Sequence, residues 1–350
     1  MSATPQDVQA KLAQAVADLE KTTVGYINKN WKTPPAGSQW ANGLALIAAA
    51  ATEAGQLVTP APPPPPPAPA RFAWDATSAM LDPTSATVCP TFAAACGLPG
   101  FFSATDAVAY ALPSDPAYAV QASATSGQQA FAGKLVNIPA GTVPGESNDK
   151  HLTVIDQMAD TETDLGAAAF SNGVWSCYSG AVSPIGAVQE TSPGDANAAA
   201  VALQGGLVTP SDIASGFINH ALVVSCGGLG PAPCPYPART DVGYTGPTKI
   251  TLGSWLRANP AATIPATLSA FERMLATAAQ QFGIFPRDTS GSTAIFAVHG
   301  LDTINQQPCL AAYSGAGVAL AGTPPSVSLS ATFGTWLAAN LQLLQPPAAT

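Results

Sequence analysis

His151, His220 and a set of acidic residues are the groups of this chain best suited to acid–base chemistry. His151 opens an apolar run, and Glu162 and Asp164 follow it, two residues apart and therefore on one face of a strand. His220 opens a second apolar run, and Asp241 lies in a later turn. If the fold gathers these five residues in a cleft, they can transfer protons to and from a glycan, or bind a hard cation through their carboxylates.

The same residues also fit a structural role. A histidine at a strand end can serve packing alone, and an Asp in a Gly/Ser turn commonly bonds its own backbone. The chain has no Gly-x-Ser-x-Gly elbow, no His-Glu-x-x-His, no P-loop and no dinucleotide fingerprint. We therefore favour a non-enzymatic protein, keep a glycan hydrolase or lyase as the alternative, and predict neither a cofactor nor a metal.

Aromatic residues in turn-rich segments are the candidate ligand-binding groups. An exposed ring there can stack on a sugar, whereas a buried ring contributes to core packing. The candidates are Trp175, Tyr178, Tyr236 and Tyr244.

The six cysteines suggest disulfides. Cys89 and Cys96 bracket one short segment, Cys226 and Cys234 bracket another, and Cys177 and Cys309 remain as a long-range pair. Six cysteines allow about fifteen pairings, so this connectivity is a hypothesis. A zinc site would need tighter spacing.

A polyproline run at residues 59–70 divides the chain. Proline has a fixed φ and no amide proton, so the run extends as a semi-rigid linker. Residues 1–58 before it show coiled-coil spacing in two short helical segments, which predicts anchoring in an assembly or a homo-oligomer such as a trimer. The alternative is a helical hairpin that folds onto the rest. Residues 71–350 form the third part, called the head below.

The charge content of the chain indicates which kinds of binding partner to expect. Charged residues make up only 9% of the chain and the net charge is −9, with no basic cluster, so nucleic acid is not expected as a partner. Residues 1–58 contain as many lysines as acids, so the negative charge falls on the head. The amino terminus lacks an export-signal pattern, and no apolar stretch is long enough to span a membrane.

The head is predicted to be mainly β, a sandwich or jelly-roll-like fold with a few helices, because short apolar runs alternate with turn residues. The expected strands are Lys134–Ile138, Leu152–Asp156, Gly173–Tyr178, Ala221–Ser225, Lys249–Leu252, Thr293–His299 and Val327–Ser330. The expected helices are Ala196–Leu203, Ser211–Phe217, Thr263–Gly283 and Ser330–Leu344.

From about residue 72 to 300, the order of motifs resembles a domain of hypothetical secreted proteins of actinobacteria and of minor tail proteins of their phages, including mycobacteriophage-like ones. The matching segments are Leu81–Ala86, Val136–Gly141, His151–Asp156, Glu162–Leu165, Gly205–Ile213, Gly216–Leu222, Pro237–Asp241, Phe271–Gly283 and Arg287–Asp288.

This resemblance implies a place on a virion tail, where disulfides without an export signal are natural because the particle is released by lysis. Residues 1–58 would then contact other tail proteins, and the head would bind a glycan or glycolipid of the host cell surface. The alternatives are an envelope-polysaccharide-degrading enzyme carried on the tail and a purely structural virion protein.

Overall fold

The computed structural model of the chain describes residues 72–97, 100–231, 233–240, 244–290, 293–298, 313–315, 317–322 and 325–347. The predicted anchoring segment (1–58) and linker (59–70) lie outside the described residues, as do Asp241 and Cys309.

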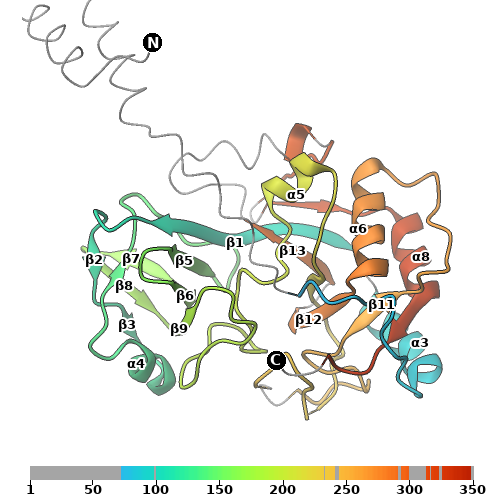
Figure 1. Cartoon of the computed structure of the whole chain (residues 1–350), viewed down its shortest axis with the longest axis horizontal. Coiled ribbons are helices and arrows are strands. Elements are labelled where there is room, and N and C mark those ends of the chain that lie inside the picture. Colours follow the sequence, from blue (N-terminus) through green and yellow to red (C-terminus); the bar gives the residue numbers. More distant parts are fainter. Residues whose placement is uncertain are drawn as a thin grey trace, which may run out of the picture. The chain divides into compact units, whose positions relative to one another are not determined.

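Short strands and a few helices make up the described head (Figure 1). The helices are α3 (Ser85–Cys96), α4 (Thr125–Phe131), α5 (Pro210–Ser215), α6 (Ala270–Gln281) and α8 (Ala331–Asn340). The strands are β1 (Phe101–Ala111), β2 (Ala117–Tyr118), β3 (Gln121–Ala122), β4 (Val136–Asn137), β5 (Leu152–Asp156), β6 (Thr161–Gly166), β7 (Ala169–Ser171), β8 (Val174–Cys177), β9 (Ser179–Pro184), β10 (Leu222–Ser225), β11 (Leu256–Ala258), β12 (Ile284–Asp288), β13 (Ala294–Val298), β14 (Ser326–Ser328) and β15 (Leu341–Leu343). The prediction of a mainly β fold with a few helices is confirmed.

The strands form a 10-stranded mixed sheet in the order β15-β11-β12-β10-β13-β1-β5-β6-β9, with β14 paired to β1, plus two small sheets. Strand β1 pairs in parallel with both β13 and β5, and β10 pairs in parallel with β12. Parallel neighbours require crossover connections. The sheet therefore differs in detail from a jelly roll, whose strands pair antiparallel.

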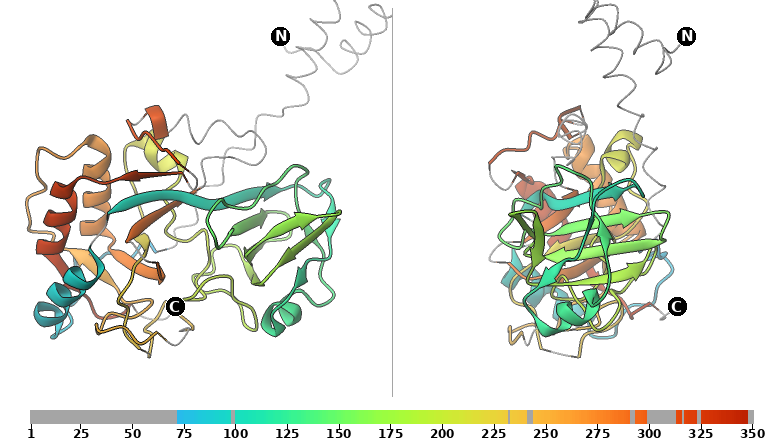
Figure 2. Two further views of the ribbon diagram at one scale, coloured as in Figure 1. Left: turned by 180° about the vertical axis from the view of Figure 1, so that it is seen from behind. Right: turned by 90° about the vertical axis from the view of Figure 1, so that its left-hand side faces the viewer.

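The long strand β1 joins two hydrophobic clusters. Its first half pairs with β13, its second half pairs with β5, and the register shifts between Ala104 and Asp106. One cluster packs α3, α6 and α8 against β10–β13, and the other packs α4 against β5, β6 and β8. Figure 2 shows β1 running from the helices of the first cluster to the strands of the second. The change of partner along β1 places Asp106 at the junction of the two clusters.

Local sequence signals explain the best-formed helix. Ser269 caps α6 in a capping box with Glu272, and the helix buries Phe271, Leu275 and Ala279 on one face. None of the described helices combines the length and apolar character that crossing a membrane requires.

Candidate functional site

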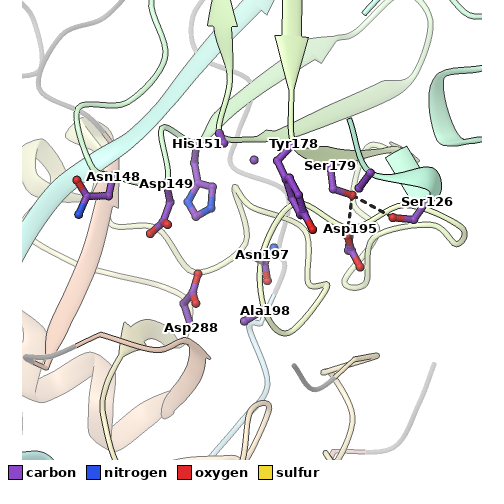
Figure 3. A pocket seen from close by; sticks show the side chains of 14 residues that line it. Ser126, Asn148, Asp149, His151, Tyr178, Ser179, Asp195, Asn197, Ala198 and Asp288 are labelled. Carbon is purple, nitrogen blue, oxygen red and sulfur yellow. Dashed lines mark hydrogen bonds between the residues drawn. The ribbon is translucent and has the colours of Figure 1, made fainter. Parts of the chain in front are cut away.

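A pocket of about 460 Å³, called the His151 pocket here, opens where the two clusters meet. Figure 3 shows its polar side chains converging from several segments. They are Ser126 of α4, Asn148, Asp149 and His151 before β5, Tyr178 and Ser179 at the start of β9, Asp195 and Asn197 of the loop that follows, and Asp288 at the end of β12.

His151 is held by a buried chain of charges. Its Nδ1 lies 2.7 Å from Oδ1 of Asp106, and the guanidinium of Arg287 donates to Oδ2 of Asp106, also at 2.7 Å. Arg287 is fully buried, donates to the carbonyl of Leu203 at 2.9 Å, and stacks 4.5 Å from the centre of the Phe296 ring. Because Nδ1 is engaged by Asp106, Nε2 is the nitrogen that can meet a ligand in the pocket.

Electrostatics favour the charged forms of this pair. Burial alone would raise the pKa of Asp106, but the charge of Arg287 and the hydrogen bond from His151 hold that pKa at about 2. Burial also opposes the imidazolium, yet the hydrogen bond and charge of Asp106 raise the pKa of His151 above its ordinary 6.5. His151 can thus donate a proton when charged, and accept one at Nε2 when neutral.

Asp288 lies near this histidine, and Tyr244 lies near Asp288. Burial raises the pKa of Asp288, against the lowering effects of the positive charges of His151 and Arg287. Burial also raises the pKa of Tyr244, whose hydroxyl bonds to Thr289 and feels the charge of Asp288. An Asp with a raised pKa beside a histidine is a common arrangement at functional sites.

The opposite wall offers hydroxyls and an aromatic ring. The Ser179 hydroxyl donates to Asp195 at 2.7 Å, and the Ser126 hydroxyl lies 3.3 Å from that of Ser179. Tyr178 is 65% exposed although it lines the pocket. This wall combines hydrogen-bonding groups with a ring face, as polyhydroxylated ligands require.

Glu162 and Asp164 lie side by side on β6, as the spacing predicted, but neither lines the pocket. Both are buried and accept hydrogen bonds from successive backbone amides, those of Gln204 and Leu203. Glu190 accepts from the amide of Ala196 at 2.7 Å, and burial together with Asp164 raises its pKa well above 4.5. These carboxylates hold in place the loop that carries Asp195 and Asn197.

His220 does not join His151 in the pocket. It is buried, with Nδ1 2.9 Å from the carbonyl of Ala221 and Nε2 3.3 Å from Asp212, which belongs to the capping box of α5. Asp241 lies outside the described residues. Of the five predicted acid–base residues, only His151 reaches the pocket in the part of the chain that the structure describes.

The four aromatic residues predicted to bind a ligand differ in solvent exposure and in position. Trp175 is only 2% exposed and belongs to the second hydrophobic cluster, so its predicted role in ligand binding is corrected to core packing. Tyr236 is half-buried and its ring packs edge-on against Trp74 at 5.9 Å. Tyr178 lines the pocket and Tyr244 lies near Asp288.

The two short-range disulfides do not form, because Cys89, Cys96 and Cys226 carry free thiols, and Cys177 is free as well. Cys89 and Cys96 both belong to α3 and are seven positions apart. At about 1.5 Å of rise per residue, their Cα atoms lie about 10 Å apart along the helix axis, which is too far for a disulfide. Cys309, the predicted partner of Cys177, lies outside the described residues.

Sequence reasoning missed Asp106, Arg287, Asp149 and Asp195. The one local signal was Asp106 itself, a single acid inside the otherwise uncharged strand Phe101–Ala111. Within the described residues, no cluster of three or more His, Cys, Asp and Glu side chains is suited to hold a metal ion.

A scan of the chain against protein-family models finds no match, and searches of curated proteins and of solved structures find none either. The resemblance to phage tail proteins therefore stays a prediction, and the function must be argued from the pocket.

Proposed function

We propose that this protein is a minor tail or tail-tip protein of an actinobacteriophage, and that its head binds a glycan or glycolipid of the host envelope in the His151 pocket. The observation that carries the proposal is the pocket itself, in which carboxylates, hydroxyls and an exposed tyrosine ring surround a fixed histidine. Sugars present several hydroxyls and apolar ring faces, which carboxylates and aromatic rings recognise.

Attachment to the particle would depend on residues 1–58, through other tail proteins and through copies of this chain. Several heads on one particle would raise the apparent affinity for a surface glycan. Deletion of residues 1–58 should remove the protein from purified particles. Particles that retain the shortened chain would contradict this assignment.

Binding can be tested with the purified protein and immobilised actinobacterial envelope polysaccharide. Tyr178→Ala and Asp288→Asn should each weaken binding about tenfold or more, because each removes a group that faces the ligand. Met158→Ala and Asp160→Asn are matched controls, since both residues are exposed and lie outside the pocket. Equal losses in test and control variants would refute a site in this pocket.

Hydrolysis is a second candidate function, favoured by the hydrogen bond between His151 and Asp106. A carboxylate that fixes the histidine tautomer and stabilises its charged form is a recurrent feature of acid–base catalysis. His151→Asn should then reduce the release of soluble sugar by about 10²–10⁴-fold. His220→Asn, which changes a buried histidine outside the pocket, should leave release unchanged.

The same incubation separates the candidates. Retention on the envelope without release of sugar supports glycan binding alone. Release that depends on His151 supports the enzyme. Neither retention nor release would overturn both and leave a purely structural virion protein.

A further inference from the structure

Two cysteines that are far apart in the sequence, Cys96 at the end of helix α3 and Cys226, lie near each other in the fold. The Cys96 thiol donates a hydrogen bond to the carbonyl of Gly227 at 2.6 Å, although the two residues are 131 positions apart. The two thiols also interact electrostatically, since Cys226 lowers the pKa of Cys96 and Cys96 raises the pKa of Cys226. A Cβ built on the next residue, Gly228, would lie 3.4 Å from the Cys96 sulfur, so the backbone after Cys226 passes close to this thiol.

Backbone contacts fix both cysteines. The carbonyl of Cys96 accepts from the Thr293 hydroxyl at 2.5 Å, and Gly97 ends α3 in the left-handed region. Cys226 follows β10 directly, and its amide donates to the carbonyl of Asp288 at 3.2 Å. The two cysteines are thus held near each other by elements that pack in the first hydrophobic cluster.

We propose that Cys96 and Cys226 form a disulfide when the protein meets an oxidising environment. The bond would join the end of α3 to the end of β10, beside the strand that carries Arg287 and Asp288. The proposal is independent of the function of the His151 pocket.

The reaction needs a disulfide oxidant, such as oxidised glutathione. The neighbouring Cys226 lowers the pKa of Cys96, which is also the more exposed of the two, so Cys96 is the attacking thiolate. It displaces one glutathione thiolate and forms a mixed disulfide. Cys226 then loses its proton, attacks the Cys96 sulfur and releases the second glutathione, so that two thiols are oxidised and one disulfide is reduced.

The test oxidises the full chain with glutathione, digests it without reduction and maps the cross-linked peptides by mass spectrometry. The expected result is a peptide pair joined through Cys96 and Cys226. An oxidised protein that lacks this pair, or that joins either cysteine to another partner, overturns the proposal.

Three variants complete the test. Cys96→Ser should abolish the cross-link, whereas Cys89→Ser, a change in the same helix, should leave it intact. Cys226→Ala should accumulate glutathione on Cys96, because the resolving thiol is missing. Oxidation should raise the Tm of the wild type by on the order of 10 °C and leave that of Cys96→Ser unchanged. Equal shifts in both proteins would contradict a Cys96–Cys226 bond.

Discussion

Replacing Asp106 by Asn should destabilise the head strongly, because Asn keeps the size of the side chain but removes the charge between His151 and Arg287. Both contacts are 2.7 Å long and all three side chains are buried. Removing one partner of a buried ion pair typically costs about 3–5 kcal/mol, since the remaining charge is left uncompensated in the interior.

The pKa of Asp106 gives a second measure of the same coupling. It falls from 3.8 to about 2 in the fold. At roughly 1.4 kcal/mol per pKa unit, this shift is worth about 2 kcal/mol. A depressed carboxyl pKa stabilises the fold above the unfolded value, so this contribution should be lost as the pH falls from about 4 towards about 2.

Urea unfolding over this pH range tests both free-energy values, the cost of Asp106→Asn and the pH-dependent contribution of Asp106. At neutral pH, Asp106→Asn should lower the free energy of unfolding by about 3–5 kcal/mol, and below about pH 4 the gap to the wild type should shrink by about 2 kcal/mol. Asp160→Asn, an exposed change with the same loss of charge, should stay within about 0.5 kcal/mol of the wild type. An Asp106→Asn protein as stable as the wild type, with the same pH dependence, would refute the reasoning.

Other consequences follow from the same groups. Because burial raises the pKa of Glu190, folding stability should fall as the pH rises above about 4.5, and Glu190→Gln should remove this slope in pH-dependent thermal melts. The raised pKa of His151 stabilises the fold below about pH 6.5 and loses that effect as the pH rises through the folded value, so His151→Gln should flatten the stability profile above about pH 6.5. Gly127→Ala should cost about 1–3 kcal/mol, because its Cβ would lie 3.0 Å from the Ser179 Cα, whereas Gly315→Ala, with nothing within 4 Å, should be nearly neutral in urea unfolding.

Local patterns in the sequence predicted the elements whose signals lie within a few residues. The strand Leu152–Asp156 was expected with the bounds that the structure shows. The helix expected within Thr263–Gly283 forms as Ala270–Gln281, because its cap and its apolar face both follow the helical period.

Tertiary contacts overrode other local preferences. The alanine-rich run Ala196–Leu203 was expected as a helix, but it forms an irregular loop. Its amides bond instead to buried carboxylates, such as Ala196 to Glu190 and Leu203 to Asp164. Likewise, the expected strand Lys249–Leu252 does not form.

The sequence by itself determined the mainly β class and pointed to His151 as a candidate chemical group. Only the tertiary structure decided what surrounds that group, because Asp106 is 45 residues away from it and Arg287 is 181 residues away from Asp106. The proximity of Cys96 to Cys226 is likewise decided only by the tertiary structure. Secondary structure depends on neighbours within one turn or one pleat, whereas these contacts depend on which distant strands pair and on the crossovers that make β1 parallel to both β13 and β5.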